Sequence, residues 1–205
     1  MSSAPISRGF RGRGGGTRDA RVPPGQHLVE DFPVLSAGPT PPVDLAGWRL
    51  SLEDGDSPLA EWTWAQFQAL PQTDLTVDIH CVTTWSKLDT NWKGVSIDTL
   101  LEAAGLTEPP QPYVLAHCDG GYTTNIPAED LLDGKAMIAW EYEGEALDPE
   151  HGGPARLLVP HLYFWKSAKW VQKLQFVDPE VPGFWEENGY HIYGDPWREQ
   201  RYDGD

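Results

Sequence analysis

The chain has 205 residues, of which 40 % are hydrophobic and 22 % charged, and ten are tryptophans. This apolar and aromatic content excludes an intrinsically disordered chain and suffices for one substantial core, but hardly for two. The formal net charge of −16 argues against general binding to nucleic-acid backbones, because an acidic surface repels phosphate.

Charge separates an N-terminal leader from the rest of the chain. Residues 1–22 hold five of the fifteen basic residues and one of the thirty-one acidic ones. We therefore expect a flexible Arg/Gly-rich leader over 1–22 and a single domain over 23–205. No nucleic-acid partner is expected, although an Arg/Gly segment can touch RNA weakly.

The sequence contains no apolar run of the roughly 18 residues that a membrane span needs, so no membrane association is expected. The N-terminal residues also lack the apolar segment of a secretory signal. The prediction is a cytoplasmic protein whose two cysteines, Cys81 and Cys118, stay reduced.

Nineteen prolines and twenty-one glycines favour short strands joined by turns. Apolar periodicity and capping residues predict these elements in chain order: strand 48–52, helix 63–70, strand 75–82, helix 96–104, strand 113–118, a helical turn at 128–132, and strands 136–142, 156–159 and 171–177. The mixture is typical of the α+β class. No glycine-rich loop of the dinucleotide-binding or P-loop type links a strand to a helix.

Cys81 comes at the end of an expected strand and before a loop that carries Trp85 and Trp92. The thiol can be a buried small hydrophobe, or the nucleophile of a hydrolase beside His80 or His117. A zinc site made from the two His-Cys pairs is disfavoured, because adjacent side chains of a strand point to opposite faces.

A second candidate site lies in HGGPAR and SAK, residues 151–156 and 167–169. The glycines allow a bulky anion to approach the backbone, Arg156 offers a forked donor, and Lys169 offers a point charge. These residues predict either a site for a phosphate-bearing ligand or a turn with surface salt bridges.

Four motifs carry a family resemblance: HCVTTWSKLDTNWKGVSI, HCDGGYTTNIP, GEALDPEHGGPARLLVP and SAKWVQKLQF. In this order they resemble the sulfite oxidase family, and the chain from about residue 23 to at least 177 is similar to a small, haem-free bacterial member of these molybdopterin-dependent oxidoreductases. The resemblance implies a mixed, barrel-like α+β fold around one molybdenum–molybdopterin cofactor.

The resemblance also implies roles for individual residues. Cys81 matches the single protein ligand of the metal, and Trp85 matches a residue that shapes the substrate pocket. The residues implied to contact the rest of the cofactor are Leu35, Ser36, Asp119, His151, Arg156, Ser167 and Lys169.

The departures from the family pattern bear on the substrate. Leu35 and Ser86 stand where sulfite oxidases are expected to carry arginines, so a neutral S-oxide or related small molecule is favoured. The predicted reaction is transfer of an oxygen atom to or from such a substrate. The alternatives are sulfite oxidation, a thiol-dependent hydrolase, and a non-catalytic cofactor-binding module.

The expected electron-transfer partner and the expected oligomeric state are inferred from motifs that the sequence lacks. No haem, flavin or iron–sulfur motif occurs, so electrons are expected to pass to or from a separate carrier protein. No C-terminal dimerisation domain of the family is recognisable, and a monomer is expected. The aromatic tail 183–202 can cover the sheet or form a lip of the substrate funnel, and burial is the favoured role.

Overall fold

The computed structural model describes residues 20–205, and residues 1–19 of the expected leader lie outside the described residues. Arg21 donates two hydrogen bonds to the Asp89 carboxylate, at 2.7 and 3.0 Å, and Val22 is buried. The packed part of the chain therefore begins no later than Arg21.

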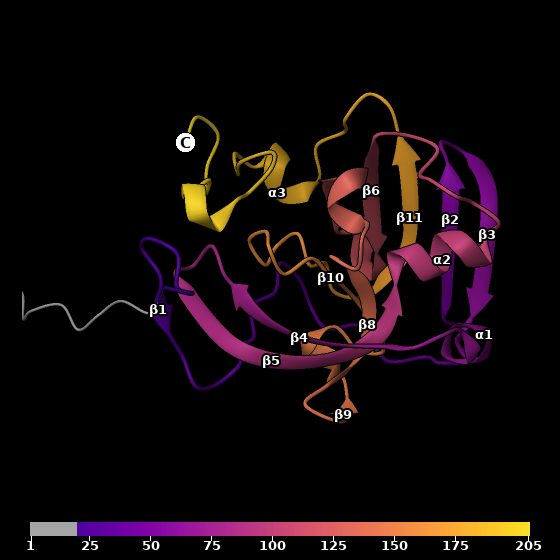
Figure 1. The fold of residues 1–205 in the computed structure, drawn as a ribbon, viewed down its shortest axis with the longest axis horizontal. Coiled ribbons are helices and arrows are strands. Elements are labelled where there is room, and N and C mark those ends of the chain that lie inside the picture. The colour runs from indigo at the N-terminus through magenta and orange to yellow at the C-terminus, as the bar shows by residue number, and fades with distance from the viewer. Residues whose placement is uncertain (1–19) are drawn as a thin grey trace, which may run out of the picture.

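Two mixed sheets and a few short helices make up the fold (Figure 1). The strands are β1 His27–Leu28, β2 Arg49–Asp54, β3 Ser57–Thr63, β4 Thr73–His80, β5 Trp85–Ser96, β6 Tyr113–Cys118, β7 Thr123–Pro127, β8 Met137–Tyr142, β9 Glu145–Ala146, β10 Arg156–Leu158 and β11 Val171–Val177. The α-helices are α1 Trp64–Ala69, α2 Ile97–Ala103 and α3 Phe184–Glu187. This composition confirms the predicted α+β class.

One sheet has the strand order β3-β2-β11-β6-β7 and stands at the right of Figure 1. Within it, β11 pairs parallel with β2 and antiparallel with β6. A strand from the end of the chain is thus inserted between strands from its beginning and middle. This insertion brings the segment just before β11 next to the end of β6.

The other sheet follows the path β1-β5-β8-β10, with β4 paired to β5 and β9 to β8. Its 12-residue strand β5 sweeps across the lower part of Figure 1. The prediction of a loop around Trp85 and Trp92 is therefore wrong. The polar residues there read as a loop, but exposed Asp89 and Asn91 alternate with buried Thr90 and Trp92, as a half-buried strand requires.

Both main predicted helices are present, and the first residue predicted for each, Thr63 or Ser96, is its N-cap. Thr63 Oγ1 accepts from the Gln66 backbone N–H at 3.3 Å, and Gln66 Oε1 accepts from the Thr63 N–H at 2.9 Å, which is a capping box. Ser96 Oγ accepts from the Thr99 N–H at 3.1 Å at the start of α2. In residues 20–205, no helix has the length and apolarity needed to cross a bilayer.

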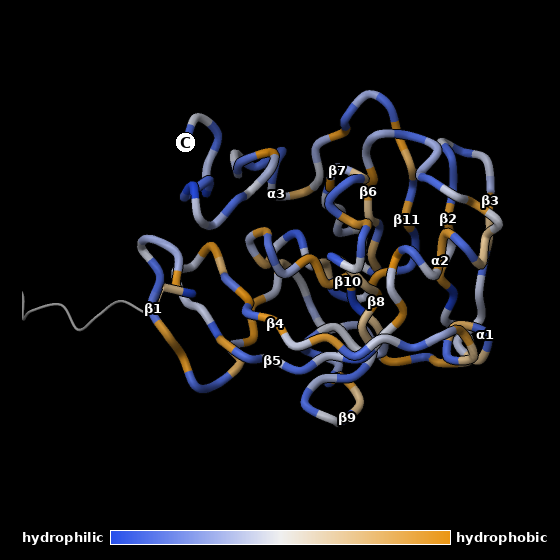
Figure 2. Tube along the Cα trace, viewed as in Figure 1, coloured by the Kyte–Doolittle hydropathy of each residue, from blue (hydrophilic) through white to orange (hydrophobic). Residues whose placement is uncertain are grey.

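The sheet that contains β8 and β10 is covered on both faces. Ile138 and Leu157 belong to the main core against the five-stranded sheet, whereas Ala139 and Leu158 belong to a second apolar cluster. Alternate side chains of a strand point to opposite faces, so the second cluster lies on the face away from the main core. Figure 2 shows hydrophobic residues, drawn in orange, in strands of both sheets.

Candidate active site

A pocket of about 490 Å³ opens on the second cluster. The residues that line it include all nine predicted from the sequence: Leu35, Ser36, Cys81, Trp85, Asp119, His151, Arg156, Ser167 and Lys169. They come from segments more than a hundred residues apart, which only the tertiary structure brings together. The roles of the nine residues stay predictions.

The turn that follows β4 fixes Cys81. Its backbone N–H donates to the Trp85 carbonyl at 2.8 Å, and its carbonyl accepts from the Thr84 N–H at 3.0 Å. Gln26 Nε2 donates to the same carbonyl at 3.0 Å. These bonds hold Thr84 at φ 79, a value that a β-branched residue rarely adopts. The strand and turn together set the position of the thiol.

Cys81 is 7 % exposed and lines the pocket. Burial raises the pKa of Cys81, while a hydrogen bond from Thr83 Oγ1, at 3.2 Å from Sγ, and the charge of Arg156 act in the opposite direction. The thiol is thus buried and accessible to a ligand in the pocket. A bound metal cation would favour its thiolate form.

The geometry does not support the hydrolase alternative. His80 Nδ1 lies 2.8 Å from Ser86 Oγ, and His117 Nε2 lies 2.8 Å from Gln175 Oε1. Neither imidazole lines the pocket beside Cys81. Over residues 20–205, no group of three or more His, Cys, Asp or Glu side chains could hold a metal by itself.

Arg156 opens onto the same pocket from the first position of β10. It pairs with Ala139 and shares the face of Leu158, so the alternation of the strand directs it away from the main core. Its side chain is fully buried, with Cζ 4.2 Å from the centroid of the Phe164 ring.

The Arg156 guanidinium is held by backbone carbonyls. Nη1 donates to the His151 carbonyl at 2.8 Å, and Nη2 donates to the Ser167 carbonyl at 2.5 Å. Within the described chain, no carboxylate forms an ion pair with it. Burial lowers the pKa of Arg156 to about 9, so it remains charged at neutral pH. A buried cation with this environment favours an anionic ligand.

Two further groups lie beside this cation. Lys169 Nζ donates to the Glu150 carbonyl at 2.6 Å, and His151 stacks on Phe32 with centroids 4.0 Å apart. Burial, followed by the charges of Arg156 and Lys169, lowers the pKa of His151 and favours the neutral imidazole. Gly152 adopts φ +112, and a Cβ there would come within 3.2 Å of the Lys169 Cα, so glycine permits this packing.

Two buried polar atoms at the pocket have no partner. They are Nε1 of Trp85, whose residue is 5 % exposed, and Nδ1 of His151. Leaving such atoms unsatisfied is costly, so they mark positions where a ligand can donate or accept.

The remaining predicted residues differ in accessibility. Asp119 is exposed in the turn after β6, and Leu35 and Ser36 are exposed on the segment that borders the pocket. Ser167 is buried, and its Oγ accepts from the Val159 N–H at 2.8 Å. Ser86, by contrast, is buried against His80 and does not line the pocket, so only Leu35 occupies a pocket position expected to hold an arginine.

Most of the aromatic lining of the pocket was not predicted from the sequence. Phe32, Phe164, Trp165 and Trp170 surround the predicted residues. Three of the four lie in YFWKSAKW, where the density of aromatic residues around the predicted Ser and Lys was the available signal. The tail also contributes Phe184, Trp185 and Tyr190. The expectation that the tail serves burial is therefore incomplete.

Anion binding at Lys169 should depend on pH. Burial, with Arg156 second, lowers the pKa of Lys169 to about 8. We expect the affinity of the ligand-free protein for sulfate to fall roughly tenfold between about pH 7 and about pH 9. Sulfate keeps its charge over this range, whereas Lys169 loses its proton as the pH rises through its pKa. Sulfate binding therefore weakens as the pH rises. Titration calorimetry measures the change.

Matched lysine variants test the source of this pH dependence. Lys169→Met should weaken binding at about pH 7 and reduce the change between the two pH values. Lys173→Met should keep the wild-type profile, because Lys173 pairs with Glu53 at 3.0 Å away from the pocket. Equal affinities and profiles for wild type and Lys169→Met would contradict the prediction.

Comparisons with known proteins identify similar chains. A sequence profile described as "Oxidoreductase molybdopterin binding domain" matches residues 37–185. The uncharacterized oxidoreductase YuiH of Bacillus subtilis is 44 % identical over 190 residues, which are 92 % of this chain and 95 % of that protein. The putative protein-methionine-sulfoxide reductase subunit YedZ1 of Azospira oryzae is 31 % identical over 74 % of this chain and 57 % of its own length.

More distant similarities cover smaller parts of longer proteins. The mitochondrial sulfite oxidase of Drosophila melanogaster is 25 % identical over 78 % of this chain and 32 % of its own length. The crystal structure of the sulfane dehydrogenase SoxCD from Paracoccus pantotrophus superposes with a TM-score of 0.60 and 25 % identity, covering 69 % of this chain and 41 % of that chain.

Proposed function

Because the chain belongs to the oxidoreductase molybdopterin binding domain family, we propose that this enzyme transfers one oxygen atom to or from a small neutral substrate, with S-oxides favoured. The sulfite oxidase-type fold and the requirement for the molybdenum cofactor follow from the family match and from the relatives. The cofactor supplies two-electron redox chemistry coupled to oxygen-atom transfer.

The residues of the pocket fit this cofactor. A soft thiol at Cys81 and a buried cation at Arg156 open onto one pocket, and this single observation carries the proposal. The thiol suits a metal already bound by sulfur, and the guanidinium, which lacks a carboxylate partner, suits a phosphate. The unpartnered Nδ1 of His151 and Nε1 of Trp85 add positions for polar atoms of a ligand.

The chain's own groups divide the work at the two ends of the pocket. Cys81 would ligate the metal, and Arg156, Lys169 and His151 would hold the phosphate end, with Ser167 orienting the backbone around Arg156. Asp119, Leu35 and Ser36 would line the cofactor from exposed turns, and Trp85 would shape the substrate position. Tight apolar packing by the second cluster would limit water near the thiol.

The charges of the lining favour a neutral substrate over sulfite. In the described lining of the pocket, the basic residues are Arg156 and Lys169, and both are assigned to the phosphate end. No further lysine or arginine of the described lining remains to attract a small dianion. The similarity to YedZ1, a putative protein-methionine-sulfoxide reductase subunit, supports S-oxides as substrates of this chain.

We further propose that electrons are exchanged with a separate carrier protein, since YedZ1 is named as a subunit. A cytoplasmic location and a monomeric state stay predictions from the sequence. Cell fractionation checks the first, and sedimentation equilibrium of the purified protein checks the second.

A dye-linked assay of the molybdenum-loaded enzyme tests the reaction. Reduced viologen should support turnover of S-oxides with a catalytic efficiency at least about tenfold above that for N-oxides, while sulfite oxidation with an electron acceptor should be weaker still. Efficient sulfite oxidation without S-oxide turnover would replace the proposed reaction with its alternative. Protein without molybdenum, made in a molybdate-starved host, is the control.

A further inference from the structure

The C-terminal segment forms an aromatic wall on one side of the pocket. We use this name for Trp185 and Tyr190, which line the pocket and are both half-buried. The Tyr190 ring lies 4.9 Å from that of Trp185 and stands edge-on to Trp165 at 5.3 Å, centroid to centroid. The contacts among the three rings hold Trp185 and Tyr190 in place while both still line the pocket.

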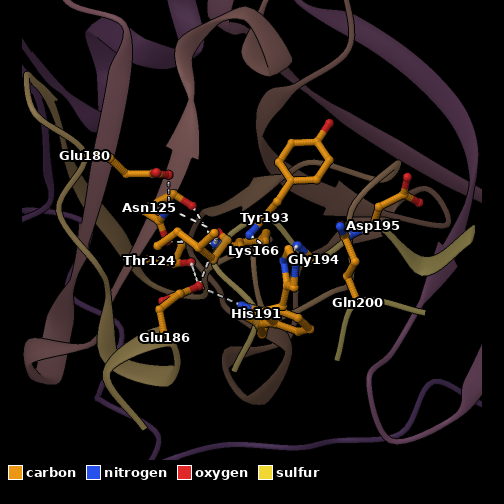
Figure 3. Close-up of polar contacts among 12 residues, drawn as sticks. Thr124, Asn125, Lys166, Glu180, Glu186, His191, Tyr193, Gly194, Asp195 and Gln200 are labelled. Atoms are coloured by element: carbon orange, nitrogen blue, oxygen red, sulfur yellow. Dashed lines mark hydrogen bonds and ion pairs between the residues drawn. The ribbon is translucent and has the colours of Figure 1, made fainter. Parts of the chain in front are cut away.

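Buried polar contacts fix this wall to the body of the protein. Lys166 Nζ lies 2.6 Å from Glu186 Oε1, and both side chains are almost fully buried. The same Glu186 oxygen accepts from Trp165 Nε1 at 2.8 Å and from Thr124 Oγ1 at 3.2 Å. Figure 3 shows Glu186 and Lys166 pointing toward one another beside Thr124. Since Glu186 directly follows Trp185, these bonds determine the position of the wall.

A second attachment lies farther along the tail. Gly194 adopts φ +82, and a Cβ at this position would come within 2.8 Å of the Trp165 ring. The Tyr163 N–H donates to the Gly194 carbonyl at 2.8 Å. The tail thus packs directly on the segment that carries Trp165, and the wall is preorganised for a ligand.

The chemistry of the wall suits an apolar group. Indole and phenol rings offer flat apolar faces, and helix α3, which carries Trp185, contains no lysine or arginine. The cations of the pocket, Arg156 and Lys169, are bound to backbone carbonyls at residues 150, 151 and 167. A neutral molecule with an apolar or aromatic substituent matches this arrangement better than an anion.

We propose that Trp185 and Tyr190 bind the apolar substituent of the substrate, so that the enzyme selects aryl and large alkyl S-oxides over dimethyl sulfoxide. The choice of S-oxides as the substrate class rests on the proposed oxygen-atom transfer. The contact between the wall and the substituent does not depend on the chemical step.

Binding of inert sulfones separates the wall from the reaction. Calorimetry on the molybdenum-loaded enzyme should give tighter binding for methyl phenyl sulfone than for dimethyl sulfone. Trp185→Ala and Tyr190→Leu should each weaken methyl phenyl sulfone roughly tenfold and change dimethyl sulfone less than about twofold. The ratio of kcat/KM for methyl phenyl sulfoxide over dimethyl sulfoxide should fall by a similar factor.

Two further variants control for loss of structure. Trp197→Ala should leave both sulfones unchanged, because Trp197 lies on the same tail, is 49 % exposed and does not line the pocket. Trp185→Phe should keep most of the affinity for methyl phenyl sulfone, with circular dichroism verifying the fold of each variant.

The sulfone measurements distinguish a failure of the wall from a failure of the proposed reaction. Unchanged affinity for methyl phenyl sulfone in folded Trp185→Ala and Tyr190→Leu overturns the role of the wall, whatever the turnover. Weakened sulfone binding in these variants supports the wall even where no S-oxide is turned over, and in that case the proposed reaction fails alone.

Discussion

Replacing Cys81 with serine should lower turnover of the molybdenum-loaded enzyme roughly a hundredfold or more, while the molybdenum content falls by less than about threefold. Serine preserves the size of the side chain but replaces a soft sulfur donor with a hard oxygen donor, which changes the electron density that the protein supplies to the metal. The phosphate end would still be held by Arg156 and Lys169, which lie on other segments. Metal analysis and the dye-linked assay measure the two quantities on the same sample.

Cys118 provides the matched control for this variant. It is also 7 % exposed, but it belongs to the main core and does not line the pocket. Burial raises the pKa of the Cys118 thiol, which favours its neutral form. Cys118→Ala should keep activity within about threefold and lose some stability through the cavity that it leaves. Full activity in Cys81→Ser would remove the thiol from its proposed role.

Replacing Lys166 with methionine should lower the free energy of unfolding by about 3–5 kcal/mol. The Lys166 side chain is fully buried, and its Nζ pairs with the Glu186 carboxylate (Figure 3). The same Nζ donates to the Asn125 carbonyl at 2.9 Å and to Asn125 Oδ1 at 2.8 Å. It also donates to the Ile192 carbonyl at 2.7 Å. Burial lowers the pKa of Lys166, and Glu186 opposes this effect. Removing the lysine leaves a buried carboxylate and several acceptors without a donor.

Urea denaturation measures this loss, and a double variant identifies its cause. Adding Glu186→Gln to Lys166→Met removes the stranded charge, so we expect it to restore at least about 1 kcal/mol. Lys135→Met, which removes an exposed lysine lying 4.0 Å from Asp133, should change stability by less than about 0.5 kcal/mol. A similarly small effect for Lys166→Met would contradict the stabilising role of the buried pair.

The site residues could be predicted because they lie in short motifs with few competing interpretations. The family motifs place Cys81 after a strand and Arg156 at the start of another, and the period of two along β10 then directs Arg156 toward the pocket. Helices α1 and α2 were predictable for a similar reason. Thr63, Ser96 and Gly105 are local capping signals whose effect does not depend on the rest of the fold.

Strand β5 and the tail could not be placed in this way. Lys, Asp and Asn in SKLDTNWK resemble loop residues, and the chain pairs there only because β4 and β8 offer backbone partners on both sides. Lys166 looks like one more surface cation among the fifteen basic residues. Its burial depends on a carboxylate twenty residues away that the sequence does not connect to it.

Residue types at short spacing were enough to predict the α+β class, the family, and the thiol and cations proposed to hold the cofactor. The folded chain was needed to show that these residues share one pocket, that Ser86 does not line it, and that the tail supplies part of its wall. These features depend on contacts between segments far apart in the chain. Their free energy comes from packing and desolvation, which no local pattern records.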